Sequence, residues 1–187
     1  MVHSTTSKLV LFCLFVFFSN IAIVNAQVVS TETGTVTFTS RVPLHDFSGT
    51  SNTLVGQIDF NLKTVDFYVD LATIKTGIGK RDKDMRISLD VDSYPFAEFF
   101  GTLDAEVDLS STLPQIVTVT GKFTLHGVSN DVSISGQLQQ DGNSWTLEAE
   151  WSLLLNDYGV VPPKLLIIKV DEKQEIAISA KLKSNSN

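Results

Sequence analysis

Hydrophobic and polar residues alternate with a period of two along most of the chain after residue 34. Side chains that alternate in this way lie on opposite faces of a β-strand, whereas a helical face repeats every 3.6 residues. The segment 77–94 breaks the alternation and predicts one helical turn around residues 80–86. Elsewhere the pattern predicts eight strands, each with one apolar and one polar face, over residues 36–42, 54–60, 65–71, 99–103, 117–125, 132–138, 145–155 and 176–182.

Most connections between these strands are short and rich in Gly, Asn and Asp, as at His126-Gly127 and Asp141-Gly142-Asn143. Short connections of this kind join antiparallel strands. Eight amphipathic antiparallel strands in one domain can close either as a sandwich or as an up-and-down barrel. The chain lacks the Cys…Trp…Cys spacing of immunoglobulin domains, and a barrel leaves no sheet edge exposed. We therefore predict an all-β fold, an eight-stranded antiparallel barrel.

The first 26 residues have the layout of a secretory signal peptide. Lys8 precedes an unbroken apolar run over residues 9–18. In Val24-Asn25-Ala26, small or medium-sized residues occupy positions −3 and −1 before a cleavage point after Ala26. The run is shorter than the roughly 20 residues that a membrane span needs, which favours cleavage over an uncleaved anchor. We expect a signal peptide over residues 1–26, a single domain over residues 27–187 with no transmembrane span after cleavage, and a periplasmic or secreted protein.

Charge and cysteine content narrow the possible partners. The chain has 187 residues with 21 acidic and 14 basic side chains, a formal charge of −7. An acidic surface would not neutralise phosphates, so we expect no nucleic acid partner. Cys13 in the leader is the only cysteine, so the mature domain has no disulfide and no Cys-based metal site. His45 and His126, the only histidines after the leader, have no zinc-site spacing, and we expect no metal and no cofactor.

Small residues recur on the apolar phase of the predicted strands, at Gly56, Gly101, Gly121, Gly136, Ala149 and Ala180. An eight-stranded barrel is just filled by its side chains, or holds one small ligand where they leave space. These small residues would leave such space. Alternatively, the glycines bend the strands at barrel corners, and the sequence alone leaves both interpretations open. The other inward positions are apolar, so the space would suit an apolar ligand.

A series of motifs resembles the YceI-like family of exported bacterial proteins. In chain order they are Phe47-Ser48-Gly49, the segment 70–77, Arg81-Asp82-Lys83-Asp84-Met85-Arg86, Tyr94-Pro95 with Phe99, the run 119–128 that contains Phe123-Thr124-Leu125-His126-Gly127-Val128, and Asp157-Tyr158-Gly159. The resemblance covers residues 34–183. It implies an extended, lipocalin-like barrel with a short helical segment near its mouth, in which relatives hold a polyisoprenoid or a similar amphiphile.

Together these observations predict an exported, non-enzymatic binding protein that holds an apolar or amphiphilic ligand, a polyisoprenoid or other lipid, in the barrel lumen. The alternative is a structural or stress-response barrel whose core is filled and which acts through protein contacts. A homodimer is compatible with the sequence. His126 is expected to be a hairpin residue bonded to nearby backbone, and no catalytic residue is assigned. The residues expected to line the lumen are Phe38, Phe67, Phe99, Gly101, Gly121, Phe123, Gly136, Trp145 and Trp151, and those expected at the mouth are Arg81, Met85, Arg86 and Leu89.

Overall fold

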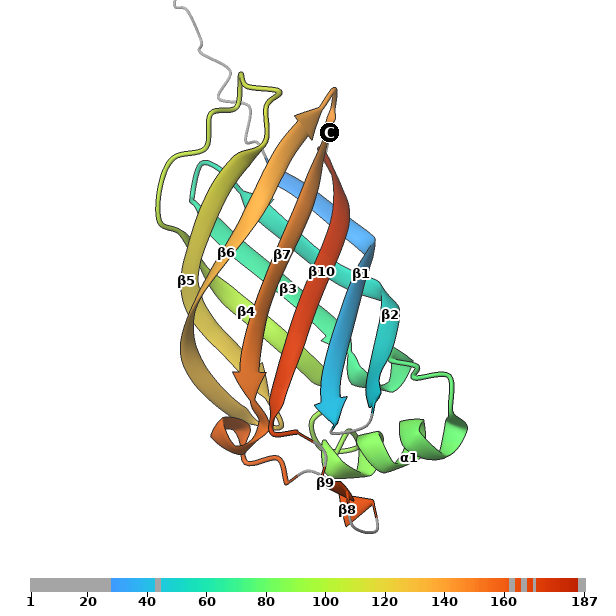
Figure 1. The fold of residues 1–187 in the computed structure, drawn as a ribbon. Helices are drawn as coiled ribbons and strands as arrows, with labels where there is room; N and C mark the ends of the chain where they lie inside the picture. The colour runs from blue at the N-terminus through green and yellow to red at the C-terminus, as the bar shows by residue number, and fades with distance from the viewer. Residues whose placement is uncertain (1–27, 43–44, 162–163, 166–167, 170, 185–187) are drawn as a thin grey trace, which may run out of the picture.

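Eight strands form one closed antiparallel barrel in the order β1-β10-β7-β6-β5-β4-β3-β2 (Figure 1). The computed structural model describes residues 28–42, 45–161, 164–165, 168–169 and 171–184, so the expected signal peptide lies outside the described residues. The predicted eight-stranded antiparallel barrel is confirmed. The strands of the barrel are β1 (Val28–Val42), β2 (His45–Asp59), β3 (Thr64–Asp70), β4 (Phe96–Leu103), β5 (Gln115–Leu125), β6 (Val128–Asp141), β7 (Ser144–Leu154) and β10 (Lys173–Ser184).

The first two strands are longer than the apolar pattern predicted. β1 and β2 pair with each other from Val28↔Asp59 to Val42↔His45, whereas alternation indicated strands only over residues 36–42 and 54–60. The additional residues include many Ser and Thr. Threonine favours strands because its branched side chain packs on a pleated surface, although it adds no apolar signal to the sequence.

The hairpin between β5 and β6 has the geometry of a two-residue turn. Both of its central residues adopt positive φ, 52° at His126 and 74° at Gly127. Two consecutive residues with positive φ match the right-handed twist of the flanking strands, and glycine adopts this backbone without strain. The turn therefore directs β6 back along β5, with Leu125 paired to Val128.

A short helix covers one end of the barrel, as expected for the segment 80–86. This helix, α1 (Gly79–Ser88), lies at that end of the barrel (Figure 1). The short strands β8 (Lys164–Leu165) and β9 (Ile168–Lys169) pair with each other as a separate small hairpin. Two single-turn helices, η1 (Leu71–Thr73) and η2 (Leu155–Tyr158), follow β3 and β7 at the same end. Within the described ranges, no helix combines the length and the apolar character needed to cross a membrane.

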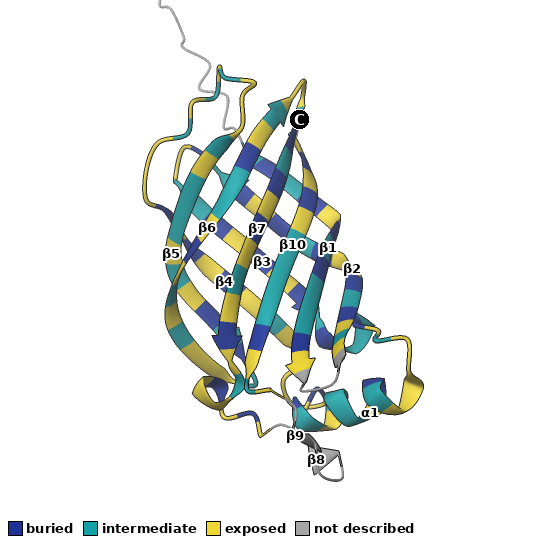
Figure 2. Cartoon of the chain, in the orientation of Figure 1, coloured by how far each residue is buried: buried dark blue, intermediate teal, exposed yellow. Residues whose placement is uncertain are grey.

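Burial alternates along much of the barrel, most clearly in β3, β4 and β7, so that dark and light bands follow one another (Figure 2). The inward side chains form one apolar cluster. At the end of the barrel away from α1, this cluster includes Val29 and Leu182, each at most 2% exposed, and Phe60 packed against Trp145. The end of the barrel away from α1 is thus closed by a solid apolar core.

Candidate functional site

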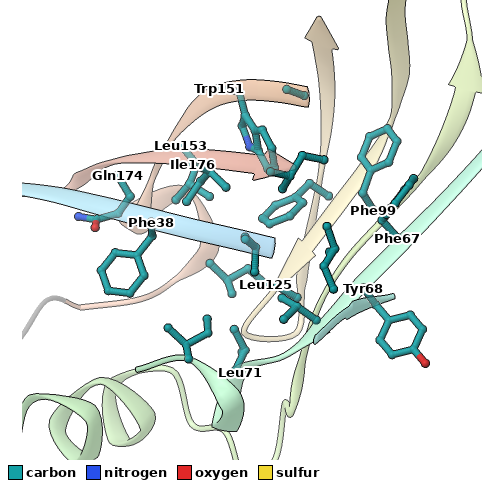
Figure 3. Close-up of a pocket in the computed structure, with 18 of the residues that line it drawn as sticks. Phe38, Phe67, Tyr68, Leu71, Phe99, Leu125, Trp151, Leu153, Gln174 and Ile176 are labelled. Carbon is teal, nitrogen blue, oxygen red and sulfur yellow. The ribbon is translucent and has the colours of Figure 1, made fainter. Parts of the chain in front are cut away.

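The interior of the barrel contains a cavity of about 370 Å³. Its walls are almost entirely aliphatic and aromatic side chains from the inward phase of the strands. Figure 3 shows several of them turned toward the common space, among them Phe38, Phe67, Phe99, Leu125, Leu153 and Ile176. The cavity reaches the surface beside α1, because exposed residues such as Ile78 and Lys80 also line it.

The burial of the inward residues shows independently that the barrel is hollow. Val117, Val119, Ile176 and Ile178 lie on the inward phase but are only partly buried. In a filled barrel such positions would be covered by the opposite wall, since interiors pack closely with few voids. Here they face the cavity and line it.

Most of the residues that the sequence predicted for the site lie around this cavity. Six of the expected lumen residues line it, namely Phe38, Phe67, Phe99, Phe123, Gly136 and Trp151. At the mouth, Arg81 and Met85 from α1 and Leu89 just after it also line the space. The structure therefore brings together side chains from strands that are distant in the sequence. Their contact with a ligand stays a prediction.

Four of the expected residues do not line the cavity. Gly101 and Gly121 face each other across β4 and β5, and a Cβ on Gly101 would lie 2.6 Å from the Thr120 carbonyl oxygen. These glycines permit close approach of two backbones rather than leaving room for a ligand. Trp145 packs on Phe60 at a ring distance of 5.0 Å, at the filled end.

Arg86 is the fourth, and its side chain is held by a contact with the backbone of η1. Its Nη1 donates to the carbonyl of Ala72 at 3.3 Å, which directs the guanidinium toward η1. The space above another glycine is also occupied, because the ring of Phe67 lies where a Cβ of Gly56 would be. Among the inward glycines of the strand pattern, only Gly136 lines the cavity.

The helix at the mouth is positioned by polar contacts. Asp82, the buried residue of α1, accepts hydrogen bonds from the backbone N–H of Thr76 at 2.8 Å and from its hydroxyl at 2.6 Å. The hydroxyl bond, followed by the backbone bond, lowers the pKa of Asp82 below its ordinary value of 3.8. These bonds tie α1 to the segment that leaves η1.

Two cations of α1 lie beside the opening of the cavity and differ in their partners. The guanidinium of Arg81 lies 4.4 Å above the ring of Phe47, in cation–π geometry. Lys80 pairs with Asp84, one helical turn later, at 2.7 Å. The mouth thus carries mixed charge around an apolar opening.

One polar residue of the wall was missed by the sequence reading. Gln174 is 4% exposed, lines the cavity, and donates from Nε2 to the hydroxyl of Ser40 at 3.1 Å. It lies two residues before Ile176 and therefore on the same, inward face of β10, which is the signal that could have identified it. The alternation of apolar residues could not find it because Gln is polar.

His126 has the role expected of it. Its Nδ1 contacts the carbonyl oxygen of Tyr158 at 3.2 Å, and its ring packs edge-on against Tyr94 at 5.3 Å. The histidine therefore fastens the β5–β6 hairpin to η2. Over the part of the chain that the structure describes, no cluster of three or more His, Cys, Asp or Glu residues could hold a metal ion.

A closed antiparallel barrel with an apolar cavity and a helix at its mouth has the architecture of lipocalin-like barrels. The model of the YceI-like domain matches residues 27–182, and this chain belongs to that family. A UPF0312 protein from Pseudomonas putida strain W619 is 33% identical over 105 residues, which are 51% of this chain and 52% of the relative. The chain thus spans about half the length of the curated relatives it matches.

Two solved structures show the same fold. A polyisoprenoid binding domain from Saccharophagus degradans, implicated in plant cell wall breakdown, superposes with a TM-score of 0.72 at 17% identity, over 85% of this chain and 99% of that domain. BcnA from Burkholderia cenocepacia superposes with a TM-score of 0.66 at 17% identity, over 81% of this chain and 96% of BcnA. At these identities the similarity establishes the architecture.

Proposed function

We propose that this protein binds an apolar or amphiphilic small molecule, a polyisoprenoid or another lipid, inside its barrel. The observation that carries the proposal is the apolar cavity of about 370 Å³ that opens beside α1. This volume lies within the range of about 300–1,000 Å³ that is usual for small-molecule sites. The polyisoprenoid binding of the Saccharophagus degradans domain supports a ligand of the lipid class.

Burial of a hydrocarbon chain in this cavity would provide enough free energy for useful affinity. Each buried methylene contributes about 0.8 kcal/mol, so about ten methylenes contribute about 8 kcal/mol before the entropic cost of association. A dissociation constant of about 1 μM corresponds to about 8 kcal/mol, so a chain somewhat longer than ten methylenes would bind in that range. Specific hydrogen bonds are not required at this affinity, which suits the apolar wall.

We further propose that binding, with no covalent step, is the function, and that the protein acts after export as a carrier or store that shields its ligand from water. The expected signal peptide over residues 1–26 supports export to the periplasm or the medium. The family match begins at residue 27, directly after the proposed cleavage point. A structural barrel that acts only through protein contacts would not need a hollow core, so the cavity disfavours that alternative.

Extraction of the protein with organic solvent tests the proposal. Protein purified after export should release a lipid that mass spectrometry detects at near-stoichiometric amount. A delipidated sample should then bind an environment-sensitive apolar dye, and the recovered lipid should displace it. A preparation that contains no lipid and binds neither the dye nor long-chain alcohols would contradict the proposal.

A further inference from the structure

The pairing of β6 with β7 is interrupted over a long part of the barrel wall. These strands pair only from Gly136↔Ala149 to Asp141↔Ser144. On its other side, β6 pairs with β5 down to Val128, and β7 pairs with β10 down to Leu154. The strands therefore separate toward the α1 end, as the ribbon shows (Figure 1). We call this unpaired stretch, residues 128–135 of β6 and 150–154 of β7, the seam.

A second cleft, of about 500 Å³, lies at the seam. Its walls combine polar and apolar groups from β6, β7, η2 and the start of β10, including Asn130, Ser152, Asp157 and Lys173. Trp151 and Leu153 line both this cleft and the internal cavity. These side chains therefore separate the cavity from the outside at the seam.

Aromatic packing takes the place of the missing backbone hydrogen bonds. Trp151 and Tyr158 both pack edge-on against Phe123, at ring distances of 5.9 Å and 5.7 Å. η2, which carries Tyr158, is tied to β6 by a hydrogen bond from Asn130 Nδ2 to the Asp157 carbonyl at 2.9 Å. The seam is thus closed by side chains, which rearrange more easily than paired strands.

The indole of Trp151 has an unmet hydrogen-bonding requirement. Among the residues that the structure describes, its Nε1 is the one buried side-chain nitrogen or oxygen without a hydrogen-bond partner. Buried polar groups are nearly always paired, and each exception calls for an explanation. A hydrogen-bond acceptor that arrives with a ligand would supply one. The missing strand pairing between β6 and β7 would let the wall open at the seam to admit it.

We infer that the seam is a subsite for the polar end of the ligand, where Trp151 Nε1 donates a hydrogen bond to an acceptor oxygen while the apolar chain lies in the cavity. The inference rests on the proposed function. It makes Trp151 a residue that determines specificity, because an amphiphile with an acceptor at one end gains a bond that a bare hydrocarbon does not.

The charges around the cleft favour an uncharged acceptor. Asp131 is neutralised by Lys122 at 2.9 Å, and the other charged residues that line the cleft, Asp157 and Lys173, carry opposite signs. No net charge is available to attract an anionic or cationic head group. The subsite therefore suits a hydroxyl, ester or amide oxygen, and a long-chain alcohol is the simplest probe.

Nuclear magnetic resonance of the two indole N–H groups tests the inference, because Trp145 and Trp151 are the only tryptophans. With dodecan-1-ol added to the delipidated protein, we expect the Trp151 resonance to move downfield, as hydrogen bonding requires. The Trp145 resonance, at the filled end of the barrel, should stay in place. Trp151→Phe keeps an aromatic ring but removes the donor, and we expect its dissociation constant for dodecan-1-ol to rise about two- to tenfold, the effect of one hydrogen bond.

Trp145→Phe is the matched control, and its affinity for dodecan-1-ol should equal that of the wild type. The inference is overturned if dodecan-1-ol binds by calorimetry while the Trp151 resonance does not move, or if Trp151→Phe binds it as tightly as the wild type. That result would leave the binding function intact. If neither dodecan-1-ol nor the apolar dye binds, the proposed function itself fails, and the subsite fails with it.

Discussion

The two ends of the barrel are built from the same alternating pattern but differ in how they are filled. Away from α1, Val29 and Leu182 are at most 2% exposed and Trp145 packs on Phe60, and none of these residues lines the cavity. Toward α1, inward residues such as Phe38 and Ile176 are only partly buried, because they face the cavity. One end thus holds the fold together and the other leaves room for a ligand.

This difference separates stability from binding within a single wall. A side chain in the filled end contributes through close packing, and its truncation leaves a new void. A side chain that lines the cavity already borders empty space, so its truncation removes contact area but creates no new cavity. Substitutions should therefore divide according to the end of the barrel in which they lie.

The largest loss of stability is expected at the filled end. Leu182 is 0% exposed, and Leu182→Ala should lower the free energy of unfolding by about 3 kcal/mol, the middle of the range for buried leucines. Ile176→Ala, at the cavity, should cost about 1.5 kcal/mol, because mainly the transfer energy is lost. Urea denaturation of both variants measures the difference, and equal losses would contradict the division between the two ends.

A methyl group added between β4 and β5 should cause the next largest loss of stability. The Cβ in Gly121→Ala would collide with the carbonyl oxygen of Phe100 and with the backbone of Gly101. Because backbone atoms cannot move aside, the strands must separate, at a cost of about 2 kcal/mol. The matched control is Gly79→Ala, since a Cβ at Gly79 would have no heavy atom within 4 Å. If the melting temperature falls equally in both variants, the close approach of β4 and β5 at Gly121 does not limit the residue there.

Filling the cavity should affect ligand affinity more than the stability of the fold. Val119 lines the cavity and is partly buried, so Val119→Phe would extend into the space that a ligand chain needs. We expect affinity for dodecan-1-ol to fall about tenfold, which corresponds to about 1.4 kcal/mol. The free energy of unfolding should change by less than about 1 kcal/mol, because the added ring has room. Unchanged affinity would place the ligand elsewhere.

The smallest expected effect concerns the attachment of α1. The pKa of Asp82 is lowered, first by the Thr76 hydroxyl and then by the Thr76 backbone N–H. The carboxylate therefore stabilises the folded state at pH values above its ordinary pKa of 3.8, and this contribution is lost as pH falls through the lowered folded value. Asp82→Asn should remove this contribution to the pH dependence of the free energy of unfolding. It should also speed the release of dodecan-1-ol at neutral pH, because α1 is then less firmly attached.

Stopped-flow measurement of that release tests the role of α1. Asp92→Asn, at an exposed position outside the helix, is the control and should release dodecan-1-ol at the wild-type rate. If Asp82→Asn releases no faster than Asp92→Asn, the bonds between Asp82 and Thr76 do not control access to the cavity.

The sequence predicted the barrel because alternation reports which face of a strand is inward, and it placed Phe38, Phe123 and Trp151 correctly on the cavity side. It could not distinguish Gly136, which lines the cavity, from Gly121, which allows two backbones to approach. The inward phase is the same for both. What differs is the distance to the neighbouring strand, and no single-strand pattern contains that distance.

The amino-acid sequence alone determined that eight amphipathic strands would close into a barrel with an apolar inner face, since a period of two and short polar turns allow few other arrangements. Only the tertiary structure decided where that interior is filled, where it is hollow, and where its wall loses its pairing between β6 and β7. The physical reason is that hydrophobic burial specifies which side chains turn inward, whereas the volume left between them depends on how far apart the opposite walls and neighbouring strands come to lie.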